Sequence, residues 1–473
     1  MLKRSLVVAA LIGATCVSTQ SLAETAAAPA VAVPQPPPMT VEKLDNGLTV
    51  VLVPFPSPGI VAYFTLVEAG ARDEVEAGRS GYAHLFEHLM FRGTDTVSAE
   101  EYGRRIQAMG ADDNASTSSD MTVYTTTAPS DALPDLVKLN ADRFAHLHVA
   151  EPKYKDETGA VLGERNKGFA DPHAQMDEAL RALTFKTHTY GHTTIGFKHD
   201  VEDMPSQYEY SRQFFKRFYT PDDCVVFVVG DFDGGKALAE IKEAYGPWRG
   251  KRARTDVHPE LEQKKPRATS VNWKTPTDPL LDIAYRIPAM KTSLADTAAL
   301  ATLVAASFGE PSELYQRLIV KDQKLLELEA SPRGAETKDP GVLEIEAKLG
   351  GKASFDEIIG DVQSTIDSAA RGELPAERVA AASRHLLNQG ILGAQTAPSL
   401  ASRLASLTGR TGDVQAYGKY MAALAQVKPE DVARVAKMLT PAHRDVVTLT
   451  TGQEPDAKDA APKKPSKKTG GAK

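Results

Sequence analysis

The pentapeptide His84-Leu85-Phe86-Glu87-His88 stands between Gly81 and Gly93 and decides how the first half of this chain is interpreted. Helical residues four apart share a face, with about 5–6 Å between their Cβ atoms. In a helix, His84 and His88 therefore reach one ion at the ~2.0–2.1 Å typical of zinc and imidazole nitrogen. Glu87 lies beside them, displaced by one residue from His88, where it addresses a metal-bound water. The stretch predicts a helix that carries a metal site.

Local signals around the pentapeptide favour this helix. Ser80 is placed to serve as its N-cap, and Gly93 lies where a C-cap glycine is expected. An apolar stripe suited to core packing consists of Leu85, Phe86, Leu89 and Met90. The alternative is that the two histidines are ordinary core or surface residues, because short motifs also occur by chance.

Two glutamates further along the chain weaken that alternative. A catalytic zinc takes three protein ligands and keeps one position open. Glu157 and Glu164 are seven residues apart, which is two helical turns and therefore one helical face. Glu164 follows His88 by 164 − 88 = 76 residues.

This order and spacing resembles the inverted-motif zinc peptidases of the pitrilysin/insulinase family, especially the branch that contains mitochondrial processing peptidase. Further segments match the family in the same order, namely residues 91–94, Gly110, residues 114–117, residues 120–124, Pro172, residues 190–192 and residues 195–196. The resemblance rests on specific motifs from about residue 40 to about residue 250, and it is loose from about 266 to 452.

The resemblance implies an α+β fold of two homologous domains, each a mixed or antiparallel sheet packed with helices. The two domains are expected to form half of a clamshell chamber, and only the first is expected to hold metal. We place the N-terminal zinc peptidase domain at 39–250, a charged, proline-containing linker at 251–265, and the homologous non-catalytic domain at 266–452. Both domains end in a similar apolar stretch, at residues 224–230 and 445–451.

Periodicity and residue type give the expected elements within these domains. Strands are predicted at residues 48–53, 60–67, 122–127, 225–229, 281–287 and 342–349. Helices are predicted at residues 98–109, with a Ser98/Glu101 capping box, and at 132–147, 295–307, 354–371 and 376–392.

The resemblance also implies a role for each site residue. One Zn²⁺ per chain is expected on His84, His88 and Glu164. Glu87 is expected to take the proton of the attacking water and pass it to the leaving amine. Glu157 is expected behind the site, where it orients a histidine or Glu164. For Glu157 the alternative is a solvent-exposed helix carboxylate.

Asn114 and Ala115 are the candidate substrate-binding residues. They resemble the edge-strand segment with which the family binds the substrate backbone by strand addition. The alternative is an ordinary loop that leads into the strand at Thr122.

The two ends of the chain indicate an exported protein. Residues 1–23 combine Lys3 and Arg4, a short apolar run and a small-residue cleavage site, which is typical of a cleaved signal peptide and too short for a membrane span. After cleavage Cys224 is the remaining cysteine, which fits a bacterial periplasm. Residues 24–38 form a Pro/Ala-rich lead, and residues 453–473 a Lys-rich tail expected to be disordered. The net charge of −7 argues against nucleic acid as the main ligand.

Two functional classes fit these observations. The first is a zinc endopeptidase that acts on unfolded or small polypeptides. The second is a non-catalytic assembly or substrate-holding subunit, since the family also contains structural partners. The complete set of His84, Glu87, His88 and Glu164 favours the enzyme, because degenerate subunits lose parts of it.

A heterodimer is expected from the second half of the chain. Active members commonly carry there an arginine and a tyrosine that hold the substrate, in a stretch resembling S-R-L-x-x-x-[IL]-R-x-x-x-G-L-x-Y. Here Val320 stands where the arginine belongs, and Glu327 stands near the tyrosine position. We therefore expect a related subunit to supply this Arg/Tyr clamp. The alternative is a chain that works alone or as a homodimer with other clamps.

Overall fold

The structure is a computed structural model, and it describes residues 37–332 and 337–451. These residues belong to one compact unit. The predicted signal peptide, nearly all of the Pro/Ala-rich lead and the Lys-rich tail lie outside the described residues. Within the described ranges, none of the helices combines the length and the apolar character needed to cross a membrane.

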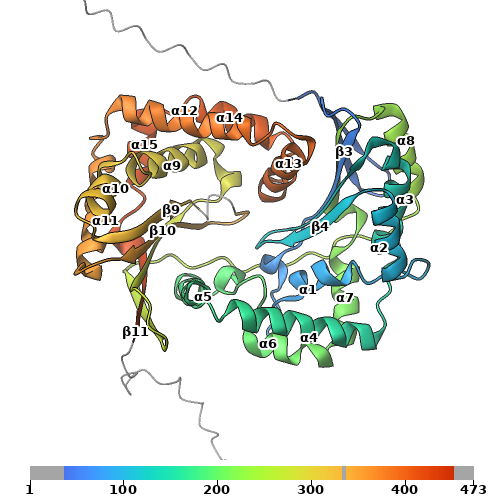
Figure 1. Cartoon of the computed structure of the whole chain (residues 1–473), viewed down its shortest axis with the longest axis horizontal. Coiled ribbons are helices and arrows are strands. Elements are labelled where there is room, and N and C mark those ends of the chain that lie inside the picture. Colours follow the sequence, from blue (N-terminus) through green and yellow to red (C-terminus); the bar gives the residue numbers. More distant parts are fainter. Residues whose placement is uncertain (1–36, 333–336, 452–473) are drawn as a thin grey trace, which may run out of the picture. The chain divides into compact units, whose positions relative to one another are not determined.

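The first half of the chain is built on a six-stranded mixed sheet (Figure 1). Its strands are β1 (Thr40–Lys43), β2 (Thr49–Pro54), β3 (Ile60–Val67), β4 (Asp112–Thr117), β5 (Thr122–Pro129) and β6 (Cys224–Gly230). Their order in space is β1-β2-β6-β3-β5-β4, in which β2 and β6 are parallel and every other neighbouring pair is antiparallel. The strand β4 therefore lies at an open edge.

The helices of the first half lie between its strands along the chain and after the last one. They are α1 (Tyr82–Leu89), α2 (Ala99–Ala108), α3 (Leu133–His146), α4 (Glu151–Gly168), α5 (Pro172–Thr184), α6 (Lys198–Asp203), α7 (Tyr208–Phe218) and α8 (Gly234–Tyr245). A short 3₁₀ helix, η1 (Ala71–Asp73), lies between β3 and α1.

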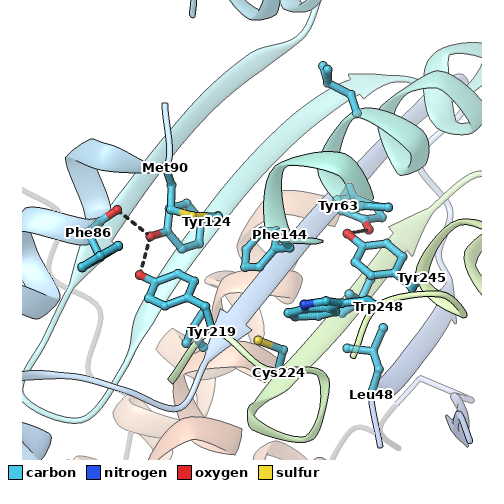
Figure 2. Close-up of a cluster of buried hydrophobic side chains, with 14 of the residues drawn as sticks. Leu48, Tyr63, Phe86, Met90, Tyr124, Phe144, Tyr219, Cys224, Tyr245 and Trp248 are labelled. Atoms are coloured by element: carbon cyan, nitrogen blue, oxygen red, sulfur yellow. Dashed lines mark hydrogen bonds between the residues drawn. The ribbon is translucent and has the colours of Figure 1, made fainter. Parts of the chain in front are cut away.

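A core rich in aromatic side chains packs between these helices and the sheet (Figure 2). The hydroxyl of Tyr124 on β5 donates to the Phe86 carbonyl of α1 over 3.1 Å and pairs with the Tyr219 hydroxyl at 2.7 Å. Tyr63 and Tyr245 form a second buried hydroxyl pair at 2.7 Å. Because buried hydroxyl groups need partners, the Tyr124 bond helps to specify how α1 sits on the sheet, and the Tyr63–Tyr245 pair does the same for α8.

The second half repeats the same architecture. Its strands are β7 (Arg267–Trp273), β8 (Leu280–Ile287), β9 (Leu325–Ser331), β10 (Gly341–Leu349) and β11 (Arg444–Thr451). Its helices are α9 (Leu294–Ser307), α10 (Glu313–Tyr315), α11 (Phe355–Ala370), α12 (Ala376–Leu392), α13 (Ala397–Thr411), α14 (Ala416–Leu424) and α15 (Pro429–Ala436), with a π-helical turn, η7, at Gln316–Lys321.

Both sheets have one topology, so the prediction of two homologous domains, each a mixed sheet packed with helices, is confirmed. The second sheet has the order β7-β11-β8-β10-β9, with β7 and β11 parallel. When the strands of each half are numbered from β2 and from β7, both orders read 1-5-2-4-3. The strand β1 is the single addition to the first sheet.

The two halves exchange one helix each. The helix α5 of the first half packs on β7, β8 and β11 of the second sheet, where Met176 and Leu180 join a buried cluster with Leu280 and Val447. In return, α13 of the second half packs on β3 and β6. Since α13 and the helices of the first half cover both faces of that sheet, all seven residues of β6 are buried.

Most predicted elements are present, with two corrections at α1. Ser80 is not its N-cap: Gly81 holds that position at φ 92°, and the Ser80 hydroxyl donates to Asp200 instead. Gly93 is not the C-cap, because the helix ends at Leu89 and Met90 caps it. The loop alternative for residues 112–117 is wrong, since they form β4. The predicted linker at 251–265 contains no helix or strand.

Candidate metal centre

The centre is formed where α1 packs against α4 (Figure 1). One face of α1 buries Leu85, Phe86 and Leu89 in the core. The opposite face turns His84 and His88 toward α4, so the amphipathic pattern of the helix itself aims both imidazoles at one place.

The predicted ligand atoms converge on one point. Glu164 Oε2 lies 3.7 Å from His84 Nε2 and 3.5 Å from His88 Nε2, and the three ligand atoms all lie within 4.8 Å of one another. Two ligands at ~2.0–2.1 Å from a tetrahedral zinc are about 3.4 Å apart. The two separations from Glu164 Oε2 are close to this value, so the residues present fit a zinc site. Among residues 37–332 and 337–451 this is the single cluster of such side chains with metal-binding spacing.

The two imidazoles have different surroundings. Burial lowers the pKa of His84, which keeps its ring neutral as a metal ligand must be, and its Nδ1 atom is buried without a hydrogen-bond partner. The Nδ1 atom of His88 lies 3.5 Å from Glu157 Oε2, and this contact raises the pKa of His88.

Glu157 occupies the position predicted for a residue behind the metal. Its Oε1 forms an ion pair of 2.7 Å with Arg92 Nε, while its Oε2 faces His88. Burial alone would raise the pKa of Glu157, but the contacts of its carboxylate with His88 and Arg92 lower it below its ordinary value. An ionised Glu157 directs the Nδ1 proton of His88 toward itself and leaves Nε2 free for a metal. The solvent-exposed alternative is wrong, because Glu157 is 7% exposed.

Glu87 is tied to the edge of the sheet. Its Oε2 accepts a hydrogen bond of 2.6 Å from Thr117 Oγ1 at the end of β4. The side chain is thereby held between the histidine helix and the open strand. This is where a general base must stand if a peptide binds along that strand.

Asn114 and Ala115 lie in β4, opposite Thr125 and Tyr124 of β5. The strand β4 has a neighbour on one side only. It is therefore an edge strand, as is the family segment that residues 114 and 115 resemble. The Asn114 side chain turns back, and its Oδ1 accepts from the Ala115 backbone N–H at 2.8 Å. Binding of substrate by these two residues stays a prediction.

Three residues at this centre were not predicted from the sequence. Thr117 follows Ala115 by two positions, so strand alternation puts both on one face and is the signal that pointed to it. Arg92 follows His88 by four positions, but α1 has already ended there. Glu74 bonds to the first turn of α1 from seven residues before Gly81, and no local pattern announces it.

The clamp positions of the second half do not present an arginine and a tyrosine for binding substrate. Val320, in η7, is 58% exposed. Arg317 forms an ion pair of 2.8 Å with Asp361 of the helix α11. Tyr315 and Glu327 line a cavity of about 1040 Å³ inside the second half.

Comparison with known families matches both halves. Residues 51–198 match the model described as Insulinase (Peptidase family M16), and residues 207–386 match the Peptidase M16 inactive domain. The zinc protease PqqE of Helicobacter pylori is 24% identical over 398 residues, which cover 83% of this chain and 88% of that protein. The probable zinc protease PqqL of Escherichia coli is 29% identical over 274 residues, which cover 56% of this chain and 29% of that protein.

Solved structures share the fold. A protease from Helicobacter pylori superposes with a TM-score of 0.82 at 24% identity, covering 87% of this chain and 99% of that one. The M16-like peptidase from Alicyclobacillus acidocaldarius gives 0.77 at 17% identity, covering 89% and 100%. The periplasmic protease PqqL from Escherichia coli gives 0.72 at 22% identity, and this chain spans 48% of its length.

Proposed function

Because the chain belongs to the M16 family of peptidases, we propose that it is a zinc-dependent endopeptidase that hydrolyses unfolded or small polypeptides. The observation that carries the proposal is the convergence of His84 Nε2, His88 Nε2 and Glu164 Oε2. The Glu164 side chain is 52% exposed, which leaves the solvent side of the centre accessible to water and substrate. The relatives named above are zinc proteases, which supports the same reaction.

Each residue of the centre has a separate role in the proposed peptide-bond hydrolysis. When bound, zinc lowers the pKa of a water to about 7 and polarises the carbonyl of the scissile bond. Glu87 takes the proton of the attacking water and delivers it to the leaving amine. Thr117 keeps the Glu87 carboxylate in place during both transfers. Glu157 keeps His88 oriented through Nδ1.

An extended peptide is the substrate form that this centre favours. The strand β4 has one free edge, and its last residue, Thr117, touches Glu87. A peptide added to β4 as a further strand passes Glu87 with its backbone exposed to attack. The Ala115 N–H then exchanges its hydrogen bond to Asn114 Oδ1 for one to the backbone of the incoming peptide. Tightly folded proteins cannot offer such a strand, so they are refused.

A second subunit completes the proposed enzyme. The second half of this chain lacks the Arg/Tyr clamp, and Arg317 is already paired with Asp361. This chain also has about half the length of PqqL. The proposed assembly is therefore a heterodimer with a related chain that supplies the clamp. Its proposed location is the periplasm, in keeping with the sequence of residues 1–23.

Metal analysis combined with a quenched-peptide assay tests the enzyme proposal. The expected result is one zinc per chain, cleavage of an unstructured peptide, loss of cleavage with a chelator and recovery with zinc. A purified chain that holds zinc and cleaves no peptide, alone or with its partner, supports the assembly-subunit alternative instead. The full donor set favours the enzyme over this alternative.

Co-expression with a related subunit tests the partner proposal. The pair is expected to elute as one complex from a size-exclusion column and to cleave the peptide faster than this chain alone. Equal specific activity in both preparations, together with separate elution, overturns the heterodimer.

A further inference from the structure

The first turn of the metal-binding helix is held by a buried carboxylate outside the helix. Glu74 Oε2 accepts from the Gly81 N–H and Glu74 Oε1 from the Ala83 N–H, both at 2.7 Å. The Glu74 side chain is fully buried. The N-cap residue of α1, Gly81, has no side chain to supply such bonds, so the carboxylate takes the place of a cap.

This carboxylate binds the residue directly before His84, the metal ligand whose Nδ1 atom has no hydrogen-bond partner. His88 is oriented by Glu157, whereas the Nδ1 atom of His84 is buried and has no partner. The position of the His84 imidazole therefore depends on the position of the helix backbone that carries it. Directly before His84 in that backbone lies Ala83, one of the two residues whose N–H groups Glu74 binds. A displacement of the first turn would move His84 Nε2 directly, because α1 is only eight residues long.

Glu74 is itself fixed by the two residues before it. Arg72 Nε donates to Asp339 Oδ2 of the second half at 2.5 Å. Asp73 Oδ1 accepts at 3.0 Å from Arg252 in residues 251–265, called the interdomain segment below. The Arg72 N–H also donates to the Ser119 carbonyl beside β4 at 2.7 Å. The segment 72–74 thus connects α1 to the second half, to the interdomain segment and to the edge strand.

We propose that Glu74 is a positioning residue that sets the place of His84 through the first turn of α1, and that Arg72 and Asp73 hold Glu74 in register with the second half. This inference rests on the proposed function, since it assigns Glu74 to the same metal centre. Residues that orient metal ligands from outside typically contribute 10- to 100-fold in metal affinity or activity. A carboxylate that only capped the helix would affect stability and leave the metal unchanged.

The test compares Glu74→Gln with Asp445→Asn, which makes the same change at a buried carboxylate of the second half that bonds to Gln263. An amide offers one acceptor oxygen and turns N–H donors toward the other backbone N–H, so one bond to α1 is lost. Zinc affinity is measured by chelator competition, the ligand geometry by the visible spectrum of the Co²⁺-loaded protein, and kcat and KM with the quenched peptide.

Glu74→Gln is expected to weaken zinc binding 10- to 100-fold, to change the Co²⁺ spectrum and to lower kcat with little change in KM. Asp445→Asn is expected to lower the melting temperature and to leave zinc affinity and the spectrum as in the wild type. Equal zinc affinity, spectrum and kcat in Glu74→Gln and the wild type overturn the inference, whatever happens to stability.

A second variant keeps the test decisive if Glu74→Gln does not fold. Arg72→Ala retains the buried carboxylate and removes the ion pairs of Arg72 with Asp339 and Asp73. It is expected to weaken zinc binding about 2- to 10-fold, a smaller effect than direct loss of an orienting residue. Unchanged zinc affinity in a folded Arg72→Ala then overturns the inference. Failure of the proposed function looks different, because the wild-type protein itself would then bind no zinc or cleave no peptide.

Discussion

The two halves of the molecule have the same strand order and differ in the helices that would carry a metal site. In the first half, α1 follows the second strand of the 1-5-2-4-3 sheet and packs against α4. In the second half, α9 occupies the same place and packs against α12. Figure 1 shows both pairs. Shared topology therefore supplies the frame for a metal site, and side chains alone decide whether one is present.

The helix α9 has apolar residues where α1 has metal-ligating histidines. Ala299 and Leu303 are four residues apart, as His84 and His88 are, and both are fully buried. Ten of the 14 residues of α9 are apolar and most of the helix is buried, so it serves as a core element for the second half. The helix α1 gives up such packing on one face in order to present two imidazoles to α4.

Loss of the ligands or the base in the first half is expected to have the largest effect. His84→Ala, His88→Ala and Glu164→Gln should each abolish or severely weaken zinc binding. Glu87→Gln should retain zinc and lose about 10²–10⁴-fold in kcat, because an amide cannot accept the proton. Zinc stoichiometry and peptide turnover separate the two classes. Full activity in Glu87→Gln removes the general-base assignment, and stoichiometric zinc with normal turnover in Glu164→Gln moves the third ligand elsewhere.

The reverse change tests whether helix spacing alone makes a site. Ala299→His combined with Leu303→His should bind no second zinc and should destabilise the protein by about 3 kcal/mol or more, because polar rings replace buried apolar groups. Urea unfolding and metal analysis measure both quantities. Val304→His, at a half-buried position of the same helix, is the control and should be milder. Two zinc ions per chain in the double variant contradict the comparison.

Removal of the support behind His88 is expected to have a smaller effect. Glu157→Gln should weaken zinc binding about 10- to 100-fold, because His88 loses the carboxylate that receives its Nδ1 proton. Chelator competition gives the affinity. Glu151→Gln lies on the same helix with an exposed side chain and should bind zinc as the wild type does. Equal affinities for both variants place Glu157 outside the metal centre.

Replacement of Asp339, which joins the halves through Arg72 and His188, is expected to have the smallest effect on stability and a defined pH dependence. Burial would raise the pKa of Asp339, but hydrogen bonds from His188 and Arg72 hold it well below its ordinary value. A lowered pKa in the folded state stabilises the fold above the unfolded value of about 3.9, and this contribution disappears as the pH falls further. Asp339→Asn should cost about 2 kcal/mol at pH 7.

Urea unfolding at pH 7, 5 and 3.5 checks this dependence. The difference between Asp339→Asn and the wild type should be constant from pH 7 to 5 and shrink at pH 3.5. Asp278→Asn, at an ion pair of 3.6 Å with Lys348 whose aspartate side chain is 52% exposed, should show a small difference throughout. A difference for Asp339→Asn that grows toward acid pH contradicts the assignment.

Sequence patterns predicted the parts of the fold that depend on local chemistry. The strands of both sheets have the apolar runs or alternation that strand geometry requires, so β3 and β8 were found within a residue or two. The caps of α1 were wrong, because Ser80 is engaged by Asp200, a residue 120 positions away. No local pattern reveals such a competitor. The exchange of α5 and α13 between the halves escaped prediction for the same reason.

The sequence by itself determined which side chains can hold a metal, because histidines four apart on a helix and a distant glutamate are fixed by residue type and spacing. It also placed Glu157 and Glu164 on one face of α4. The family resemblance assigned them different roles, but only the tertiary structure shows the contacts on which those roles depend. Glu164 faces both Nε2 atoms and Glu157 faces the Nδ1 atom of His88. Helical periodicity fixes directions within one helix, whereas the position of α1 against α4 depends on the packing of the core between them.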